Sequence, residues 1–335
     1  MIRKLIRYVQ VHRRLPTIEN FRKRRRPAMP LPSALQLEPT VACNFRCRFC
    51  PNSEFNAPGI GGSRHMALSL FRKIVDEVPT LTEIKLQGLG EPLLCPDLRA
   101  MMEYGHGKGI RFNVISNGTL VRTKLPELMP HLRRFVISFD TFDQGWADRN
   151  KSGFDVERCK DHVREMVAIR RERNPDCTVG ITTVVTHENV GEIPDILRFA
   201  AEAGVGSAGF VAVENWKTPG EADYAAASRY AAEARKVVSM ERIRELHARE
   251  GYAFQLGLQD FSPRKSACYW MFDSAYVTYD GYVTPCCVRP DRRVLHFGNV
   301  ADSAFAEVWN GEAARAFRRT HLRKTPNPIC DRCPG

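Results

Sequence analysis

Eleven cysteines are the residues of this 335-residue chain whose type and spacing point most directly to chemistry. Cys43, Cys47 and Cys50 lie in a Cys-x3-Cys-x2-Cys pattern. Three thiolates this close can bind three irons of a [4Fe–4S] cluster and leave the fourth iron open to a substrate. A zinc site and chance clustering are the alternatives, although structural zinc takes four ligands and usually shows two Cys-x2-Cys halves.

Five further cysteines lie near the C-terminus, and four of them could hold one complete cluster. These four are Cys268, Cys286, Cys330 and Cys333, with Cys287 as a possible substitute for Cys286. On this pattern alone, an iron–sulfur cluster and a zinc ribbon are equally acceptable. The odd cysteine total and the lack of a secretory signal argue against a disulfide framework. We therefore expect metal-bound thiolates in a reducing, cytoplasmic compartment.

The composition is that of a folded protein with an unusual N-terminus. Hydrophobic residues make up 43% and charged residues 26% of the chain, and no apolar run reaches the ~18 residues that span a bilayer. Residues 1–30 hold ten Lys or Arg and one Glu, so most of the net charge of +12 belongs there. We predict a basic arm over residues 1–33 that packs on the rest of the protein and whose apolar spacing allows an amphipathic helix. Peripheral membrane contact is less favoured, and nucleic-acid binding is not expected.

Strand and helix patterns alternate through the first two thirds of the chain. Apolar or β-branched runs predict six strands, at 34–41, 83–88, 111–116, 134–140, 178–185 and 207–213. Segments with helical apolar spacing separate them, which predicts a parallel α/β sheet with right-handed crossovers. Periodicity does not distinguish a complete barrel, a partial barrel and a doubly wound sheet.

The pattern changes after residue 213. Residues 221–250 predict one long helix, and residues 302–319 predict another. Between them, alternation around Asp280-Gly281 over residues 276–284 predicts a hairpin with a two-residue turn. We place a domain boundary near residues 255–262.

The first cysteine motif, with an aromatic residue before its last cysteine, resembles the radical S-adenosylmethionine (radical SAM) superfamily. The segment Gln87–Pro92 resembles the GGE element of that family, with Leu89 in place of the first glycine. The resemblance implies a partial (β/α)6 barrel over residues 34–258. It also implies SAM contacts at strand ends, namely Phe49, Gly90, Glu91, Ser116, Asn117, Ser138 and Asp140, with Thr186 and Asn189 as weaker candidates.

The C-terminal region resembles the SPASM/twitch auxiliary-cluster modules of the same superfamily. The resemblance rests on the Cys-x17-Cys spacing, the hairpin before Cys286 and the segments 296–300 and 308–311. It implies a small α+β domain over residues 259–335. Because only five cysteines are present, it favours the shorter form with one auxiliary cluster. The implied cofactors are thus SAM and two [4Fe–4S] clusters.

These resemblances imply a radical SAM oxidoreductase. Reductive cleavage of SAM would give a 5′-deoxyadenosyl radical that takes a hydrogen atom from the substrate, and the auxiliary cluster would accept an electron. We expect oxidation of a secondary alcohol of a sugar or aminocyclitol to a ketone, with flavodoxin or ferredoxin as the external reductant.

Three other functions are kept as alternatives. One is a peptide-modifying maturase that forms a crosslink. Another is an epimerase, in which a thiol returns a hydrogen atom. The third is a zinc-binding nucleic-acid adaptor. The candidate thiols for epimerisation are Cys95, Cys159, Cys177 and Cys287. Weak candidates for a catalytic base are Glu214, Lys217 and Tyr269.

Overall fold

The computed structural model describes residues 29–52, 64–212, 239–259, 268, 270–323, 325 and 327–330. Its centre is a nine-stranded sheet with the order β11-β10-β1-β3-β4-β5-β7-β8-β9. All neighbours in this sheet are parallel except β10 and β11. The strands are β1 (Ala34–Leu37), β3 (Glu83–Leu86), β4 (Arg111–Ser116), β5 (Leu132–Ser138), β7 (Thr178–Val185), β8 (Ser207–Ala212), β9 (Gln255–Gln259), β10 (Tyr276–Val277) and β11 (Val283–Thr284).

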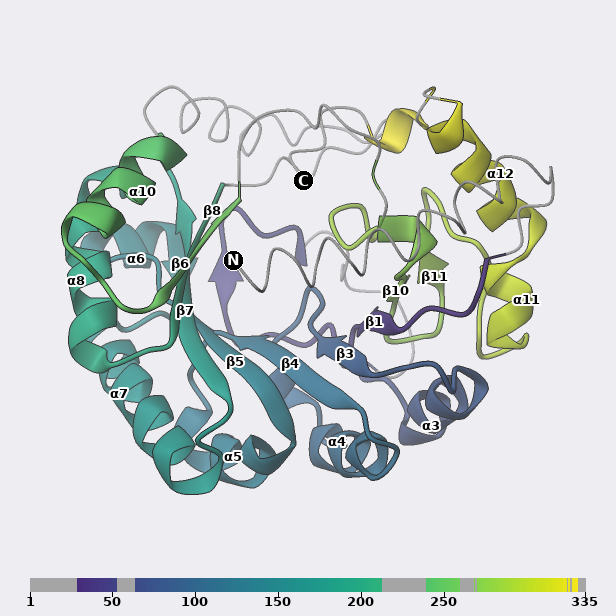
Figure 1. The fold of residues 1–335 in the computed structure, drawn as a ribbon, viewed down its shortest axis with the longest axis horizontal. Helices are drawn as coiled ribbons and strands as arrows, with labels where there is room; N and C mark the ends of the chain where they lie inside the picture. Colours follow the sequence, from purple (N-terminus) through teal and green to yellow (C-terminus); the bar gives the residue numbers. More distant parts are fainter. Residues whose placement is uncertain are drawn as a thin grey trace.

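The sheet curves, and its connecting helices cover the convex side (Figure 1). The longer helices are α3 (Leu68–Glu77), α4 (Leu98–Gly107), α5 (Val121–Leu128), α7 (Val156–Arg173), α8 (Ile193–Ala203) and α10 (Met240–Arg249). Alternate strand residues such as Leu37, Leu86, Val114 and Phe135 are fully or almost fully buried. Because side chains alternate between the two faces of a strand, the intervening residues point to the concave side.

Short elements complete the description. A second, two-stranded sheet pairs β2 (Arg46–Cys47) with β6 (Lys151–Ser152). The remaining helices are α6 (Gln144–Asn150), α11 (Phe305–Trp309) and α12 (Glu312–Leu322), and the short 3₁₀ helices are η1 (Pro92–Leu94), η2 (Met129–His131), η3 (Val190–Glu192), η4 (Trp270–Phe272) and η5 (Pro328–Cys330).

The predicted α/β fold class is confirmed, and all six predicted strands are present as β1, β3, β4, β5, β7 and β8. The sequence analysis missed β9, a short strand in which only Leu256 and Leu258 are apolar and none of the five residues is fully buried. No helix among the described residues is long and apolar enough to cross a membrane.

The predicted hairpin is present, but its loop has three residues rather than two. Thr278 N donates to Tyr282 O at 2.9 Å, so the loop consists of Tyr279, Asp280 and Gly281. Gly281 has φ +94°, the left-handed conformation that closes such loops. The hairpin joins the main sheet because β10 pairs in parallel with β1.

Both helices predicted beyond residue 213 need correction. Within 221–250, helix α10 begins only at Met240, because Ser239 is extended and its hydroxyl caps Arg242 N at 3.3 Å. Residues 221–238 lie outside the described residues. The helix predicted over 302–319 is two helices, separated at Asn310 and Gly311.

Residues at the break between α11 and α12 hold the N-terminal segment by hydrogen bonds. The Asn310 side chain accepts from Met29 N at 2.6 Å and donates to Met29 O at 2.9 Å. The Trp309 indole donates to Pro30 O at 2.9 Å. The predicted basic arm therefore ends against the C-terminal region, although residues 1–28 lie outside the described residues.

Candidate active site

The loop that follows β1 carries Cys43, Cys47 and Cys50, and a strand from elsewhere in the chain fixes it. Strand β2 places Cys47 directly opposite Lys151 of β6, which follows α6 in the connection after β5. Arg48 N donates to Asn150 O at 2.9 Å, so the pairing continues past β2. Backbone hydrogen bonds to β6 and Asn150 therefore hold the cysteine loop in place, in addition to any bound metal.

The three thiols are free and half-exposed, and they lie near one another. Burial raises the pKa of Cys47 to about 12 and that of Cys50 to about 11, while the Lys151 ammonium lowers the pKa of Cys47. The charges of Cys50 and Cys43 also raise the pKa of Cys47. Binding iron must therefore displace protons from these thiols. Among the described residues, no three His, Cys, Asp or Glu side chains converge on one metal ion.

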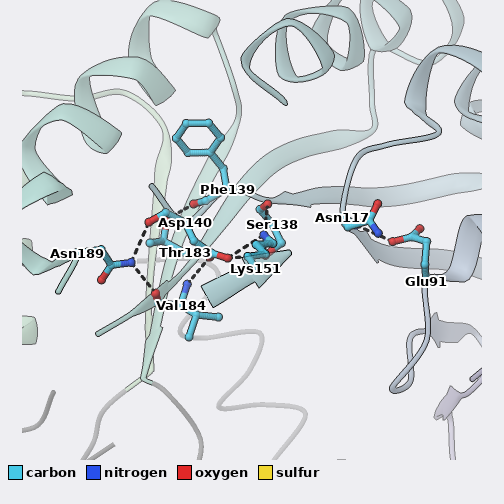
Figure 2. A network of polar contacts seen from close by, with 9 residues as sticks. All are labelled: Glu91, Asn117, Ser138, Phe139, Asp140, Lys151, Thr183, Val184 and Asn189. Carbon is cyan, nitrogen blue, oxygen red and sulfur yellow. Dashed lines mark hydrogen bonds and ion pairs between the residues drawn. The ribbon is translucent and has the colours of Figure 1, made fainter. Parts of the chain in front are cut away.

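Lys151 is the residue of this site that the sequence analysis missed. Its Nζ donates to Asp140 Oδ2 at 2.8 Å, to Ser138 O at 2.9 Å and to Ser138 Oγ at 3.1 Å (Figure 2). The side chains of Lys151 and Asp140 are only 3% and 1% exposed. The ammonium also lies 4.4 Å from the centre of the Phe154 ring. No sequence motif around Lys151 indicates this role, because only the β2–β6 pairing brings it to the cysteines.

The predicted SAM contact Asp140 lies at the centre of a fully paired network. Its Oδ1 accepts from Val184 N at 2.8 Å. Asn189 Nδ2 donates to Asp140 O at 2.8 Å and to Val184 O at 2.9 Å (Figure 2). Asn189 Oδ1 accepts from Thr186 N at 2.7 Å. The network joins the ends of β5 and β7. A direct contact of Asp140 with SAM stays a prediction.

Glu91 organises the ends of β3 and β4 in the same way. Its carboxylate accepts from Leu93 N at 3.1 Å, from Ser116 Oγ at 2.8 Å and from Asn117 N at 2.7 Å (Figure 2 draws the last of these). Burial raises the pKa of Glu91, and these three donors act in the opposite direction. Glu91, Ser116 and Asn117, which the sequence analysis proposed separately, therefore form one unit.

Two further contacts fasten this unit to the cysteine loop. Glu91 N donates to Ala42 O at 2.8 Å, and Asn117 Nδ2 donates to Asn44 Oδ1 at 2.7 Å. A Cβ atom at Gly90 would collide with the carbonyl oxygens of Thr40 and Ala42. Only glycine permits this close approach.

The remaining predicted residue of the loop, Phe49, is half-buried. Its ring centre lies 6.2 Å from that of Trp146 in α6. Trp146 is 1% exposed, so Phe49 packs on a fixed surface. Adenine contact at Phe49 stays a prediction.

The auxiliary cysteine Cys286 lies at the other end of the strands. Strand β11 runs antiparallel to β10 and places Thr284 opposite Tyr276, so Cys286 continues beyond the end of β11 and away from the Cys43 loop. Cys268, Cys286 and Cys330 are each partly exposed. A hydrogen bond with Cys287, together with burial, raises the pKa of Cys286.

Several predicted residues lie outside the described residues. They are Cys333 and the three candidate bases, Glu214, Lys217 and Tyr269. The four-cysteine ligand set of the auxiliary cluster thus stays a prediction.

Comparison with known proteins identifies two domains. Residues 37–200 match the radical SAM superfamily, and residues 268–334 match the iron–sulfur cluster-binding SPASM domain. These two domains confirm the predicted resemblance and the predicted cofactors, SAM and [4Fe–4S] clusters. The thiol donors of the cysteine loop suit such clusters, which are held by cysteine thiolates.

Sequence identity to the relatives is low, but the similarity extends over most of each chain. The chain is 24% identical to an AdoMet-dependent heme synthase of Methanosarcina barkeri, over 90% of this chain and 88% of the relative. It is 26% identical to a PqqA peptide cyclase of Ruegeria pomeroyi, over 91% and 81%. Among solved structures, Streptococcus suis SuiB bound to the precursor peptide SuiA matches with a TM-score of 0.67 at 14% identity, over 93% and 72%. The named activities differ, so they do not identify one substrate.

Proposed function

Because the chain belongs to the radical SAM superfamily and carries a SPASM domain, we propose that it oxidises a secondary alcohol of a small molecule to a ketone. When bound, SAM with the first cluster supplies a 5′-deoxyadenosyl radical that removes a hydrogen atom, and one auxiliary cluster supplies an acceptor for one electron. The hydroxyl loses its proton to a base, so two electrons and two protons leave the alcohol in total. Flavodoxin or ferredoxin is the proposed source of the reducing electron.

The observation that carries this proposal is the separation of the Cys43 loop from Cys286. The loop follows the carboxyl end of β1, whereas Cys286 lies beyond the end of the antiparallel strand β11, toward the opposite ends of the parallel strands. A substrate held on the concave face between the two ends could lose a hydrogen atom on one side and an electron on the other.

The chain's own residues prepare the SAM side of this arrangement. The buried Lys151 ammonium offsets the negative charge that accumulates when the cysteines bind iron, and Asp140 and Ser138 hold it in place. Glu91 fixes Ser116 and Asn117 at the adjacent strand ends. These residues need no rearrangement before SAM binds, which favours a preorganised site.

Peptide modification is the second candidate. It is favoured by the similarity to PqqA peptide cyclases and by the fold shared with SuiB. A crosslinking reaction also removes two electrons, so the auxiliary cluster would serve both candidates. The substrate separates them, because a dehydrogenase should act on an isolated sugar or aminocyclitol.

Iron analysis and product analysis together test the proposal. Anaerobic reconstitution should give about eight irons per chain if two four-iron clusters form. The double variant Cys330→Ala/Cys333→Ala should hold about four irons. It should still form 5′-deoxyadenosine, yet no ketone, when sugars and aminocyclitols are supplied.

A matched control is Cys177→Ala, which removes a buried, isolated cysteine. This variant should keep both clusters. The electron-acceptor role is wrong if the double variant makes ketone at the wild-type rate. Solvent deuterium at an unoxidised product carbon would instead indicate epimerisation.

A further inference from the structure

The concave face of the sheet carries a row of polar side chains that the site described above does not use. Directly paired positions on five neighbouring strands are Tyr276, Gln36, Lys85, Asn113 and Arg134, in that order. Paired residues point to the same face, and the next residues along β1, β3, β4 and β5 are buried and apolar. The row therefore faces away from the covering helices seen in Figure 1.

Some members of this row have protein partners. Gln36 Nε2 donates to Gln87 O at 3.0 Å. Asn113 Nδ2 donates to Glu83 Oε1 at 2.7 Å, and Arg134 Nη2 donates to Ser207 Oγ at 3.3 Å. These contacts hold the row in a defined geometry.

Two of three polar groups beside them are left without hydrogen bonds. The buried atom Gln87 Oε1 has no hydrogen-bond partner. Lys85 makes no hydrogen bond or ion pair with any described residue, and burial lowers the pKa of its ammonium. The third group, the buried Tyr276 hydroxyl, lies against the Glu38 carboxylate. A buried polar atom without a hydrogen bond costs free energy, so Gln87 Oε1 beside an unpaired cation indicates a missing ligand.

The three groups face a common region. Gln87 lies two residues after Lys85 on the same side of the chain. Lys85 and Tyr276 both lie within electrostatic reach of the Cys287 thiol, although two strand pairings separate their backbones. Lys85 and Tyr276 therefore both lie in the neighbourhood of Cys287, one of the cysteines that follow β11.

Glu38 keeps the Tyr276 hydroxyl protonated. Burial and the nearby Glu38 carboxylate raise the pKa of Tyr276 well above its ordinary value. Glu38 itself is held by Leu89 N at 2.9 Å and by Tyr279 N at 3.3 Å. Because the Tyr276 hydroxyl donates its hydrogen to Glu38, its oxygen offers an acceptor, as Gln87 Oε1 does, and Lys85 Nζ offers hydrogen-bond donors.

We propose that Lys85, Tyr276 and Gln87 bind the substrate of this enzyme, and that this substrate is a hydroxylated small molecule carrying an anionic group. The anion, a carboxylate or a phosphate, accepts hydrogen bonds from Lys85. Hydroxyl or amine groups of the same molecule donate to Gln87 Oε1 and Tyr276 Oη. Arg134, which also lies within electrostatic reach of Lys85, adds to the positive potential of this face. The inference rests on the proposed function, because it assigns the row to the substrate of that reaction.

Binding without turnover tests the inference. Isothermal titration calorimetry on anaerobically reconstituted full-length protein with SAM should compare glycerate, glycerol 3-phosphate and neutral glycerol. The two anions distinguish a carboxylate from a phosphate substrate. We expect at least one anion to bind tenfold or more tightly than glycerol. Lys85→Met should weaken that binding about ten- to a hundredfold, as expected for a lost charged hydrogen bond.

Three further variants serve as controls. Lys85→Arg should keep at least part of the affinity, and Tyr276→Phe should weaken it about two- to tenfold. Lys124→Met removes an exposed lysine on α5 and should bind like wild type. Iron content measured for each variant shows whether the clusters are intact.

Two results would overturn the inference. One is anions that bind no more tightly than glycerol, and the other is equal binding by Lys85→Met and Lys124→Met. Anion binding through Lys85 without any ketone would contradict the proposed function alone. Oxidation of a neutral alcohol at an unchanged rate by Lys85→Met would contradict this inference alone.

Discussion

Two lysines in the interior of this protein lie in opposite electrostatic environments. Lys151, at the edge of the sheet that carries the cysteine loop, donates three hydrogen bonds and pairs with Asp140. Lys85, on the concave face, has no such partner among the described residues, and burial lowers its pKa. The protein completes the surroundings of one cation and leaves the other incomplete.

This difference indicates that Lys151 belongs to the structural scaffold, whereas Lys85 belongs to a binding surface. Removing one partner of a buried ion pair leaves an uncompensated charge and is strongly destabilising, so Lys151 and Asp140 serve to hold the strand ends in one geometry. An unpaired cation in the interior costs free energy until a ligand binds it. Lys85 therefore lowers the stability of the free protein and provides a group that recognises a ligand. Three substitutions test this division.

The largest expected effect is that of Asp140→Ala. The substitution leaves the Lys151 ammonium buried without its counter-charge and should cost about 3–5 kcal/mol of unfolding free energy. Urea unfolding under anaerobic conditions measures it. The matched control Asp161→Ala breaks an exposed ion pair with Arg164 and should cost less than about 1 kcal/mol. Equal losses in the two variants would mean that the buried pair is not a structural anchor.

A smaller effect is expected at the loop between β3 and η1. Gly90→Ala places a methyl group against the carbonyl oxygens of Thr40 and Ala42 and should cost about 1–3 kcal/mol. It should also lower iron content, because the loop fastens the cysteine segment. Gly107→Ala, in α4 with open space around it, should instead gain about 0.5–1 kcal/mol. Thermal unfolding and iron analysis of both variants check the opposite signs, and a neutral Gly90→Ala would show that close approach is not required.

How well the sequence predicts each part of the molecule depends on whether that part is formed by residues that are near or far apart in the sequence. Local patterns predicted the six strands, the hairpin and the cysteine loop, because alternation and spacing are written in adjacent residues. The unit formed by Glu91, Ser116 and Asn117 could have been predicted, because the carboxyl ends of parallel strands meet at the same edge of a sheet. The length of the hairpin loop could not be predicted, because the alternation over residues 276–284 does not show that Thr278 pairs with Tyr282 and leaves three residues in the loop.

Residues defined by pairing between distant segments could not be predicted. Lys151 looks like an ordinary polar residue until β6 pairs with β2 and brings it beside Cys47. Lys85 looks like the polar half of an amphipathic strand until the parallel register aligns it with Tyr276 across β1. Register is a property of the whole sheet, so single-sequence periodicity contains no record of it.

The smallest expected effect is a gain of stability in Lys85→Met, about 0.5–1 kcal/mol near pH 7. Because burial lowers the pKa of Lys85 below its ordinary value of 10.5, the unfolded chain binds the proton more readily than the folded one. The cost of Lys85 is absent above pH 10.5, grows as pH falls from that value to the lower folded-state pKa, and is fully present below it, with Cys287 and Arg134 as the charged neighbours.

The gain should therefore shrink between pH 7 and about pH 10, measured as the difference in urea unfolding between variant and wild type. Lys124→Met should show no such trend. Saturating glycerate or glycerol 3-phosphate should reverse the order, since a ligand stabilises only the protein that binds it. A Lys85→Met variant that is less stable than wild type at pH 7 without ligand would place Lys85 with Lys151, as part of the scaffold.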